Sequence, residues 1–113
     1  MNERKLHKLA AVLQDAYHYF DSVSGGGTFS SKGLKGKIDL YESGRNALNE
    51  AIELAIAALG GEYLPHAYML VPESAEDITS EKQLEKEAKQ GRRKVEELAR
   101  HFHIDAYAGE VRP

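Results

Sequence analysis

The chain has 113 residues, no cysteine and a formal net charge of −3. Its length predicts one domain, residues 1–113, large enough to bury a core without covalent cross-links. The lack of cysteine excludes disulfides, thiolate metal sites and cysteine nucleophiles, and it favours a reducing, cytoplasmic location. Because no apolar run approaches the ~20 residues of a membrane span and the N-terminal sequence is unlike a signal peptide, we expect a soluble protein without membrane contacts.

A first helix is predicted over about residues 2–22. Apolar residues recur there in steps of three and four, the spacing of one seam against a partner helix. The seam consists of Leu6, Leu9, Leu13, Ala16, Phe20 and Val23.

Residues 24–37, SGGGTFSSKGLKGK, are rich in glycine and basic residues and contain no acid. Three adjacent glycines make order entropically costly, so a flexible loop is predicted. Glycine N–H groups together with lysine charge also suit a phosphate, although the GxxxxGK[ST] order of a phosphate-binding loop is missing. The candidate ligand-binding residues are Gly25, Gly26, Gly27, Thr28, Ser30, Ser31, Lys32, Lys35 and Lys37.

Residues 39–61, DLYESGRNALNEAIELAIAALGG, predict the central helix, starting near Asp39 or, because of Gly44, somewhat later. Asp39 and Glu42 have capping-box spacing, Ser43 is a second candidate cap, and two glycines end the segment. Its broad apolar face predicts cover on two sides, while one narrow strip is polar. The apolar face contains Leu48, Ile52, Ile56 and Leu59 with flanking alanines, and the polar strip contains Asn46, Asn49, Glu50 and Glu53.

A third helix is predicted over about residues 80–102, with Ser80 and Gln83 at capping-box spacing. Its inner face would contain Leu84, Ala88, Gly91, Val95, Leu98 and Phe102, and the glycine predicts a close helix–helix contact. The opposite side carries a candidate interaction surface of five cations, which we name the basic stripe: Lys82, Lys86, Lys89, Arg93 and Arg100.

The remaining segments predict short strands at 67–71, in the tail after residue 103 and, less clearly, at 37–41. Interleaved with helices, such strands would be parallel. We therefore predict a helix-rich α+β fold with three long helices and a sheet of two or three strands. The alternative is an all-α three-helix bundle with irregular connections.

The sequence offers candidates for a metal site and for an enzyme site. If residues 101–105 are extended, His101, His103 and Asp105 project to one side and suit a divalent metal; if the helix continues, they do not. An enzyme site would have to come from His18, His66, Tyr68, Glu73, Glu76 or Asp77, and no nucleophile and base among them have a familiar spacing. These residues leave an enzyme open but favour a non-enzymatic protein, and no cofactor is predicted.

Charge is distributed unevenly along the chain. Residues 39–81 carry nine acids and one base, a net charge of −8, whereas residues 82–100 carry seven bases and four acids, a net charge of +3. Such polarity often serves self-association or a charged partner. We predict a small intracellular interaction or regulatory protein that forms homo-oligomers or binds another protein. The alternatives are binding of a small molecule or a nucleotide (phosphate) by the glycine-rich loop and, less favoured, nucleic-acid binding by the basic stripe, with which no aromatic residues interleave.

Overall fold

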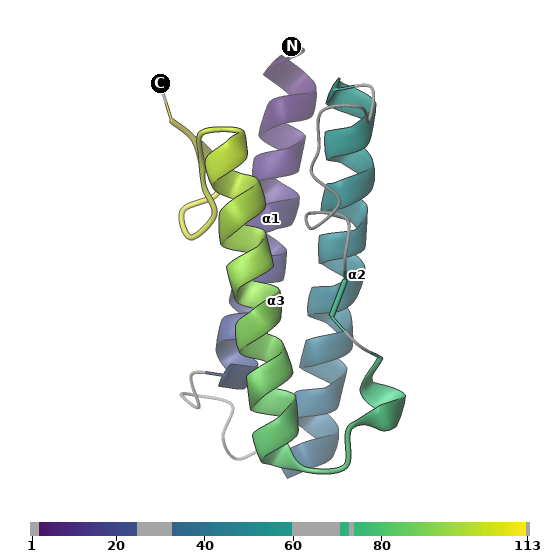
Figure 1. Cartoon of the computed structure of the whole chain (residues 1–113). Coiled ribbons are helices and arrows are strands. Elements are labelled where there is room, and N and C mark those ends of the chain that lie inside the picture. The colour runs from purple at the N-terminus through teal and green to yellow at the C-terminus, as the bar shows by residue number, and fades with distance from the viewer. Residues whose placement is uncertain (1–2, 25–32, 60–70, 73, 113) are drawn as a thin grey trace.

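A computed structural model describes residues 3–24, 33–59, 71–72 and 74–112. It contains three long helices, α1 (Glu3–Ser24), α2 (Gly33–Leu59) and α3 (Glu81–His101). In Figure 1, α1 runs downward, whereas α2 and α3 both run upward, so α1 is antiparallel to its two neighbours. A 3-10 turn, η3 (Ala75–Asp77), precedes α3, and a hairpin of β1 (Ile104–Asp105) and β2 (Glu110–Val111) follows it. These elements confirm a helix-rich α+β fold with a small two-stranded sheet.

The predicted seam of α1 forms the middle of the core. Leu9, Leu13, Ala16, Phe20 and Val23 are all buried, and Leu6 at the start of the helix is partly buried. Because α1 packs along both other helices, its seam contacts two partners within the same chain. The heptad-like spacing is therefore satisfied inside one domain.

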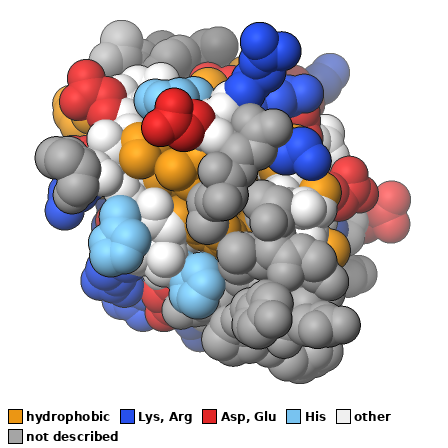
Figure 2. Space-filling view, turned by 90° about the horizontal axis from the view of Figure 1, so that it is seen from above, with side chains coloured by type: hydrophobic (Ala, Val, Ile, Leu, Met, Phe, Trp, Pro, Cys, Tyr) orange, Lys and Arg blue, Asp and Glu red, His pale blue; other side chains and the backbone are white. Residues whose placement is uncertain are grey.

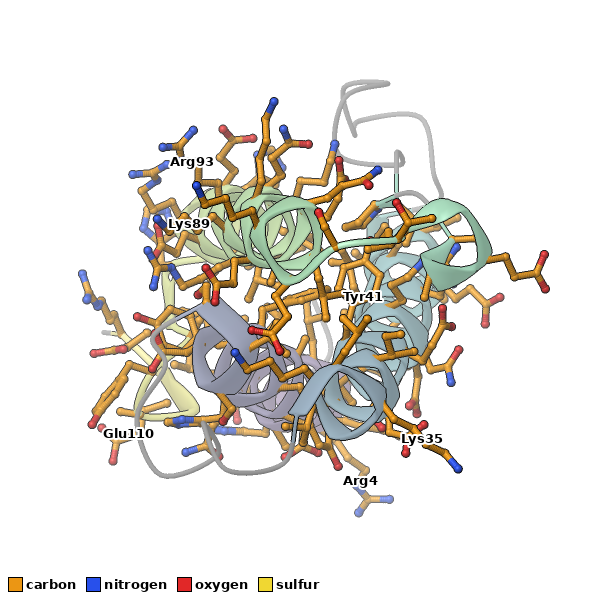
Figure 3. All side chains as sticks on the ribbon, turned by 90° about the horizontal axis from the view of Figure 1, so that it is seen from below. Arg4, Lys35, Tyr41, Lys89, Arg93 and Glu110 are labelled. Carbon is orange, nitrogen blue, oxygen red and sulfur yellow. The ribbon has the colours of Figure 1, made fainter. Side chains whose placement is uncertain are left out.

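Phe20 of α1 packs against a glycine on each of the other two helices. A Cβ atom placed on Gly91 of α3 would be 2.6 Å from Phe20 Cζ, and one on Gly44 of α2 would be 2.9 Å from Phe20 Cε1. The ring also meets the fully buried Tyr41 edge-on, with a centroid distance of 5.9 Å. Figure 3 shows Tyr41 pointing from α2 into the space between the helices. The two glycines thus leave room for one aromatic ring, which confirms the close contact predicted at Gly91.

The predicted start of the central helix is wrong. α2 begins at Gly33, so residues 33–37 are helical rather than part of a loop, and residues 37–41 are not a strand. Asp39 and Glu42 lie inside the helix, as does Ser43, whose hydroxyl donates to the Asp39 carbonyl one turn back. The early start has a physical reason, because Leu34, Ile38 and Tyr41 extend the apolar face toward the core.

The orientation of α2 agrees with the prediction. Leu48 and Ile52 are buried together with Ala51 and Ala55, and Ile56 is partly buried. The predicted polar strip is exposed at Asn46, Asn49, Glu50 and Glu53. The side chain of Leu59 and the strand predicted at 67–71, apart from Val71, lie outside the described residues.

Two side chains of α2 hold the segment that leads into α3. Glu42 accepts a hydrogen bond from the Ala75 backbone N–H at 3.0 Å, and Arg45 donates to the Pro72 carbonyl at 2.8 Å. Glu42 and Arg45 also form an ion pair at 3.1 Å. Glu42 therefore anchors a neighbouring segment instead of capping its own helix.

The start and the inner face of α3 are as predicted. Ser80 is the N-cap, and its hydroxyl accepts a hydrogen bond from the Gln83 backbone N–H at 3.2 Å. All six residues predicted for the inner face are buried: Leu84, Ala88, Gly91, Val95, Leu98 and Phe102.

The strand arrangement predicted for the tail is wrong. β1 and β2 pair antiparallel within the tail itself, with Ile104 opposite Val111. Gly109, at φ +68°, supplies the left-handed residue that the turn needs, and its N–H bonds the Asp105 carbonyl at 2.8 Å. A local hairpin therefore replaces the predicted parallel crossover.

Candidate interaction surface

The basic stripe lies on the outer side of α3. Lys82, Lys86, Lys89, Arg93 and Arg100 are all exposed, and they occupy the side opposite the buried residues of the helix. Figure 3 shows Lys89 and Arg93 pointing away from α1 and α2. The basic stripe therefore lies on the outer side of α3, where the sequence predicted it.

Two acids at the start of α3 face another helix instead of the stripe. Glu81 and Glu85 turn toward Lys37 of α2, with Nζ–carboxylate distances of 3.6 and 3.4 Å. Arg92, which is not in the stripe, pairs with Asp21 of α1 at 2.9 Å. Among the described residues, none of the five stripe cations forms an ion pair. The stripe is therefore a row of exposed cations without a direct ion-pair partner in the described part of the chain.

The predicted phosphate site is divided by the fold. Gly25 to Lys32 fall outside the described residues, and the remaining two candidates, Lys35 and Lys37, lie on α2. Lys35 is exposed, but Lys37 is 5% exposed and is held between Glu81 and Glu85. Lys37 thus joins α2 to α3, and its ammonium group is already bound by two carboxylates. The expectation that it serves an external phosphate does not fit this geometry.

The predicted metal ligands are not brought together. His101 ends α3, His103 has a left-handed backbone at φ +56°, and Asp105 is the last residue of β1. Within the described part of the chain, which includes all three, no three histidine, aspartate or glutamate side chains are grouped to hold a metal ion. The extended geometry on which the prediction rested is interrupted by the turn at residues 102 and 103. Figure 2 shows histidine side chains on the surface at this end of the bundle.

The carboxylate of Asp105 serves the hairpin itself. Its Oδ1 accepts a hydrogen bond from the Ala108 backbone N–H at 3.2 Å, and its Oδ2 lies 3.4 Å from the Arg112 guanidinium. The Ala108 N–H, and then Arg112, lower the pKa of Asp105 below its usual value. This carboxylate is therefore a turn-forming group.

The candidate enzyme residues do not assemble either. His18 Nε2 lies 3.0 Å from the Tyr107 carbonyl oxygen, so its N–H donates to the hairpin backbone. Gln14 Nε2 donates to the same oxygen at 3.3 Å, and together the two side chains fix the hairpin on α1. Glu76 and Asp77 belong to η3, far along the bundle, whereas His66, Tyr68 and Glu73 lie outside the described residues.

A cavity that the sequence did not predict lies between α1, the end of α3 and the hairpin. Its volume is about 510 Å³, within the range of small-ligand sites. Ten residues line it: Tyr17, Glu96, Ala99, Arg100, His103, Ile104, Asp105, Ala106, Tyr107 and Arg112. Sequence reasoning missed it because its wall depends on the docking of the hairpin against α1, a contact between residues about 90 positions apart.

The wall of this cavity is aromatic and partly charged. Tyr17 and Tyr107 meet edge-on at 5.8 Å between ring centroids. Burial raises the pKa of the Tyr17 hydroxyl, and the nearby Asp21 and Glu96 carboxylates add to the effect. The hydroxyl is therefore protonated at neutral pH and remains a hydrogen-bond donor.

Comparisons of the chain with protein-family models, curated proteins and solved structures found no match. None of the described helices combines the length and apolarity needed to cross a bilayer.

Proposed function

We propose that this chain is an interaction protein that binds an acidic protein surface through the basic stripe of α3. The observation that carries the proposal is that five exposed cations without an ion pair lie on one side of one helix. Lys37, Arg45, Arg92 and Arg112 each pair with a carboxylate, whereas the five stripe cations pair with none of the described residues. Exposed charge on one rigid helix is suited to attracting and orienting a partner of opposite charge.

A second copy of the chain can supply an acidic partner. Asp39, Glu50 and Glu53 are exposed on α2, on the side away from its buried face. Because the α3 stripe and these acids lie on different helices and face different directions, a contact between them would be heterologous. Such contacts form rings or open chains rather than a simple two-fold dimer. Self-association of this kind is the form of the proposal to test first.

The test is sedimentation at tens of micromolar protein, at low and at moderate salt. The proposal expects species larger than a monomer that weaken as salt rises, because exposed charges are screened over about 8 Å at physiological salt. Lys86→Glu with Arg93→Glu should reduce association strongly. The matched control is Lys8→Glu with Lys35→Glu, which changes the net charge equally at exposed positions outside α3. A monomer under both conditions would overturn self-association, and equal effects of the two double variants would show that net charge, not the stripe, matters.

A further inference from the structure

The cavity at the end of α3 adjoins the basic stripe. Arg100 is the last cation of the stripe and also lines the cavity, next to Glu96 and Ala99 on the same helix. From Lys82 to Arg100 the helix rises about 27 Å, at about 1.5 Å per residue. A row of positive charge therefore leads directly to a recess between α3, α1 and the hairpin.

The interior of the cavity favours an uncharged group. Ala99, Ile104 and Ala106 are buried and give it an apolar floor. Two acids and two bases are also in the lining, so their charges balance: Glu96, Arg100, Asp105 and Arg112. Since Arg112 and Asp105 pair with each other, neither is free to bind another charged group. A neutral aromatic side chain fits this chemistry, and Tyr17 and Tyr107 offer ring edges for it to pack against.

We propose that the stripe and the cavity form one docking surface for an acidic segment of another protein that carries an aromatic anchor at one end. The acids of the segment lie along the stripe, and the anchor fills the cavity. A second copy does not supply this ligand from its described acidic face, because Asp39, Glu50 and Glu53 on α2 have no exposed aromatic residue among them. This inference rests on the proposed function and adds the chemistry of the partner.

The two parts of the surface have different tasks. The stripe accelerates and orients encounter in a salt-dependent way, whereas burial of an anchor in a well-packed pocket supplies most of the affinity. An extended segment advances about 3.3 Å per residue, so about eight residues span the stripe. The segment is thus a short peptide, and synthetic peptides can test the proposal.

The probes are three fluorescein-labelled 12-residue peptides rich in glutamate. One has phenylalanine at the first position, one has it at the last, and one has alanine at both. Anisotropy titrations with the full chain should show that one phenylalanine peptide binds at least about tenfold more tightly than the alanine peptide. Binding of all three should weaken as salt rises. In NMR titrations, the methyl signals of Ala99, Ile104 and Ala106 should shift with that phenylalanine peptide only.

Variants separate the two parts. Tyr107→Ala removes an exposed wall of the cavity and should abolish the advantage of phenylalanine while leaving the alanine peptide unaffected. Tyr19→Ala is the matched control, because Tyr19 is also a partly exposed tyrosine but lies outside the cavity. Lys86→Glu with Arg93→Glu should weaken all three peptides by at least about tenfold.

The outcomes that would overturn the inference differ from those that would overturn the proposed function. If the phenylalanine and alanine peptides bind equally well and their binding still depends on the stripe, the anchor role of the cavity is overturned, whereas the proposal of an acidic partner stands. If no glutamate peptide binds, both the anchor cavity and the acidic partner are ruled out. Tighter binding of a 12-base-pair DNA duplex than of every peptide would assign the stripe to nucleic acid and overturn the inference as well.

Discussion

The inner and outer faces of α3 differ in how their side chains are engaged. Every inner residue from Leu84 to Leu98 is buried against α1 and α2, and Gly91 is in contact with the ring of Phe20. The outer face carries exposed cations that bond to none of the described residues. The inner residues are thus required for the fold, whereas the outer cations are not. Only the outer cations can be changed without loss of structure.

The largest effect on stability is expected for a buried residue of α2, Ile52. It is 6% exposed and packs in the core, so Ile52→Ala should lower the free energy of unfolding by about 2–5 kcal/mol. Glu53→Ala, the neighbouring residue on the exposed strip of α2, should change it by less than about 0.5 kcal/mol. Urea unfolding of both variants measures the difference, and similar losses would show that α2 is oriented incorrectly.

A smaller but more specific effect is expected at Gly91. An added methyl group would lie 2.6 Å from Phe20 Cζ, so Gly91→Ala should destabilise the protein by about 1–3 kcal/mol in spite of alanine's better helix propensity. In a Phe20→Leu background the same substitution should cost less, because the ring atom that it meets is gone. A double-mutant cycle by urea unfolding tests the contact, and additive effects would argue against it.

Lys37 lies at the boundary between the two classes of residue. It is charged but buried, and its partners Glu81 and Glu85 remain 51% and 38% exposed in their side chains. Lys37→Met keeps the apolar stem and leaves two carboxylates that water can still solvate, so the loss should not exceed about 1 kcal/mol. Thermal unfolding at low and high salt checks this. A loss of several kcal/mol would mean that the ion pairs, not the stem, hold α2 to α3.

The hairpin should respond to acid through Asp105. Its pKa in the folded chain is lower than the ordinary 3.8. The stabilisation that the ionised Asp105 carboxylate gives the hairpin is therefore complete above pH 3.8, and it is lost as the pH falls through the folded-state pKa. The amide of Ala108 should lose protection from exchange, and its chemical shift should move, in this acidic range only. Asp105→Asn should remove the transition, whereas Asp15→Asn on the exposed side of α1 should not. An unchanged transition in Asp105→Asn would assign it to another group.

The helical faces could be predicted because burial follows a period that is visible in one chain segment. The spacing of Leu9, Leu13 and Phe20, and of Leu84, Val95 and Leu98, was enough to orient α1 and α3. The start of α2 was missed because glycine and lysine composition outweighed periodicity. Lys37, Tyr41 and Leu48 lie in one buried row of α2, and a lysine in that row is stable only because α3 brings two glutamates to it.

The site was predictable to a similar extent. The stripe depends on one helix alone, so its members could be identified from their spacing. The cavity depends on Gln14 and His18 binding the Tyr107 carbonyl and on Gly109 lying close to Gln14, which are contacts between the two ends of the chain. No local pattern encodes such contacts. The aspartate and glycine of the 105–109 turn did carry a hairpin signal that could have replaced the metal hypothesis.

The smallest effect on stability is expected on the outer face of α3, from Lys86→Glu with Arg93→Glu. The change converts two repulsive pairs, Lys82 with residue 86 and Lys89 with residue 93, into attractive ones. It also places two acids, at 93 and 97, four residues apart. These terms are each about 0.2–0.5 kcal/mol and of opposite sign, so the free energy of unfolding should change by less than about 0.5 kcal/mol.

Urea unfolding of this double variant, compared with Lys8→Glu plus Lys35→Glu, measures that change directly. Both double variants should unfold at nearly the same denaturant concentration as the unmodified chain, while only the α3 variant loses binding to acidic partners. A loss of more than about 1 kcal/mol from the α3 variant alone would show that the stripe supports the fold. The contrast between the two faces of α3 would then no longer separate structure from function.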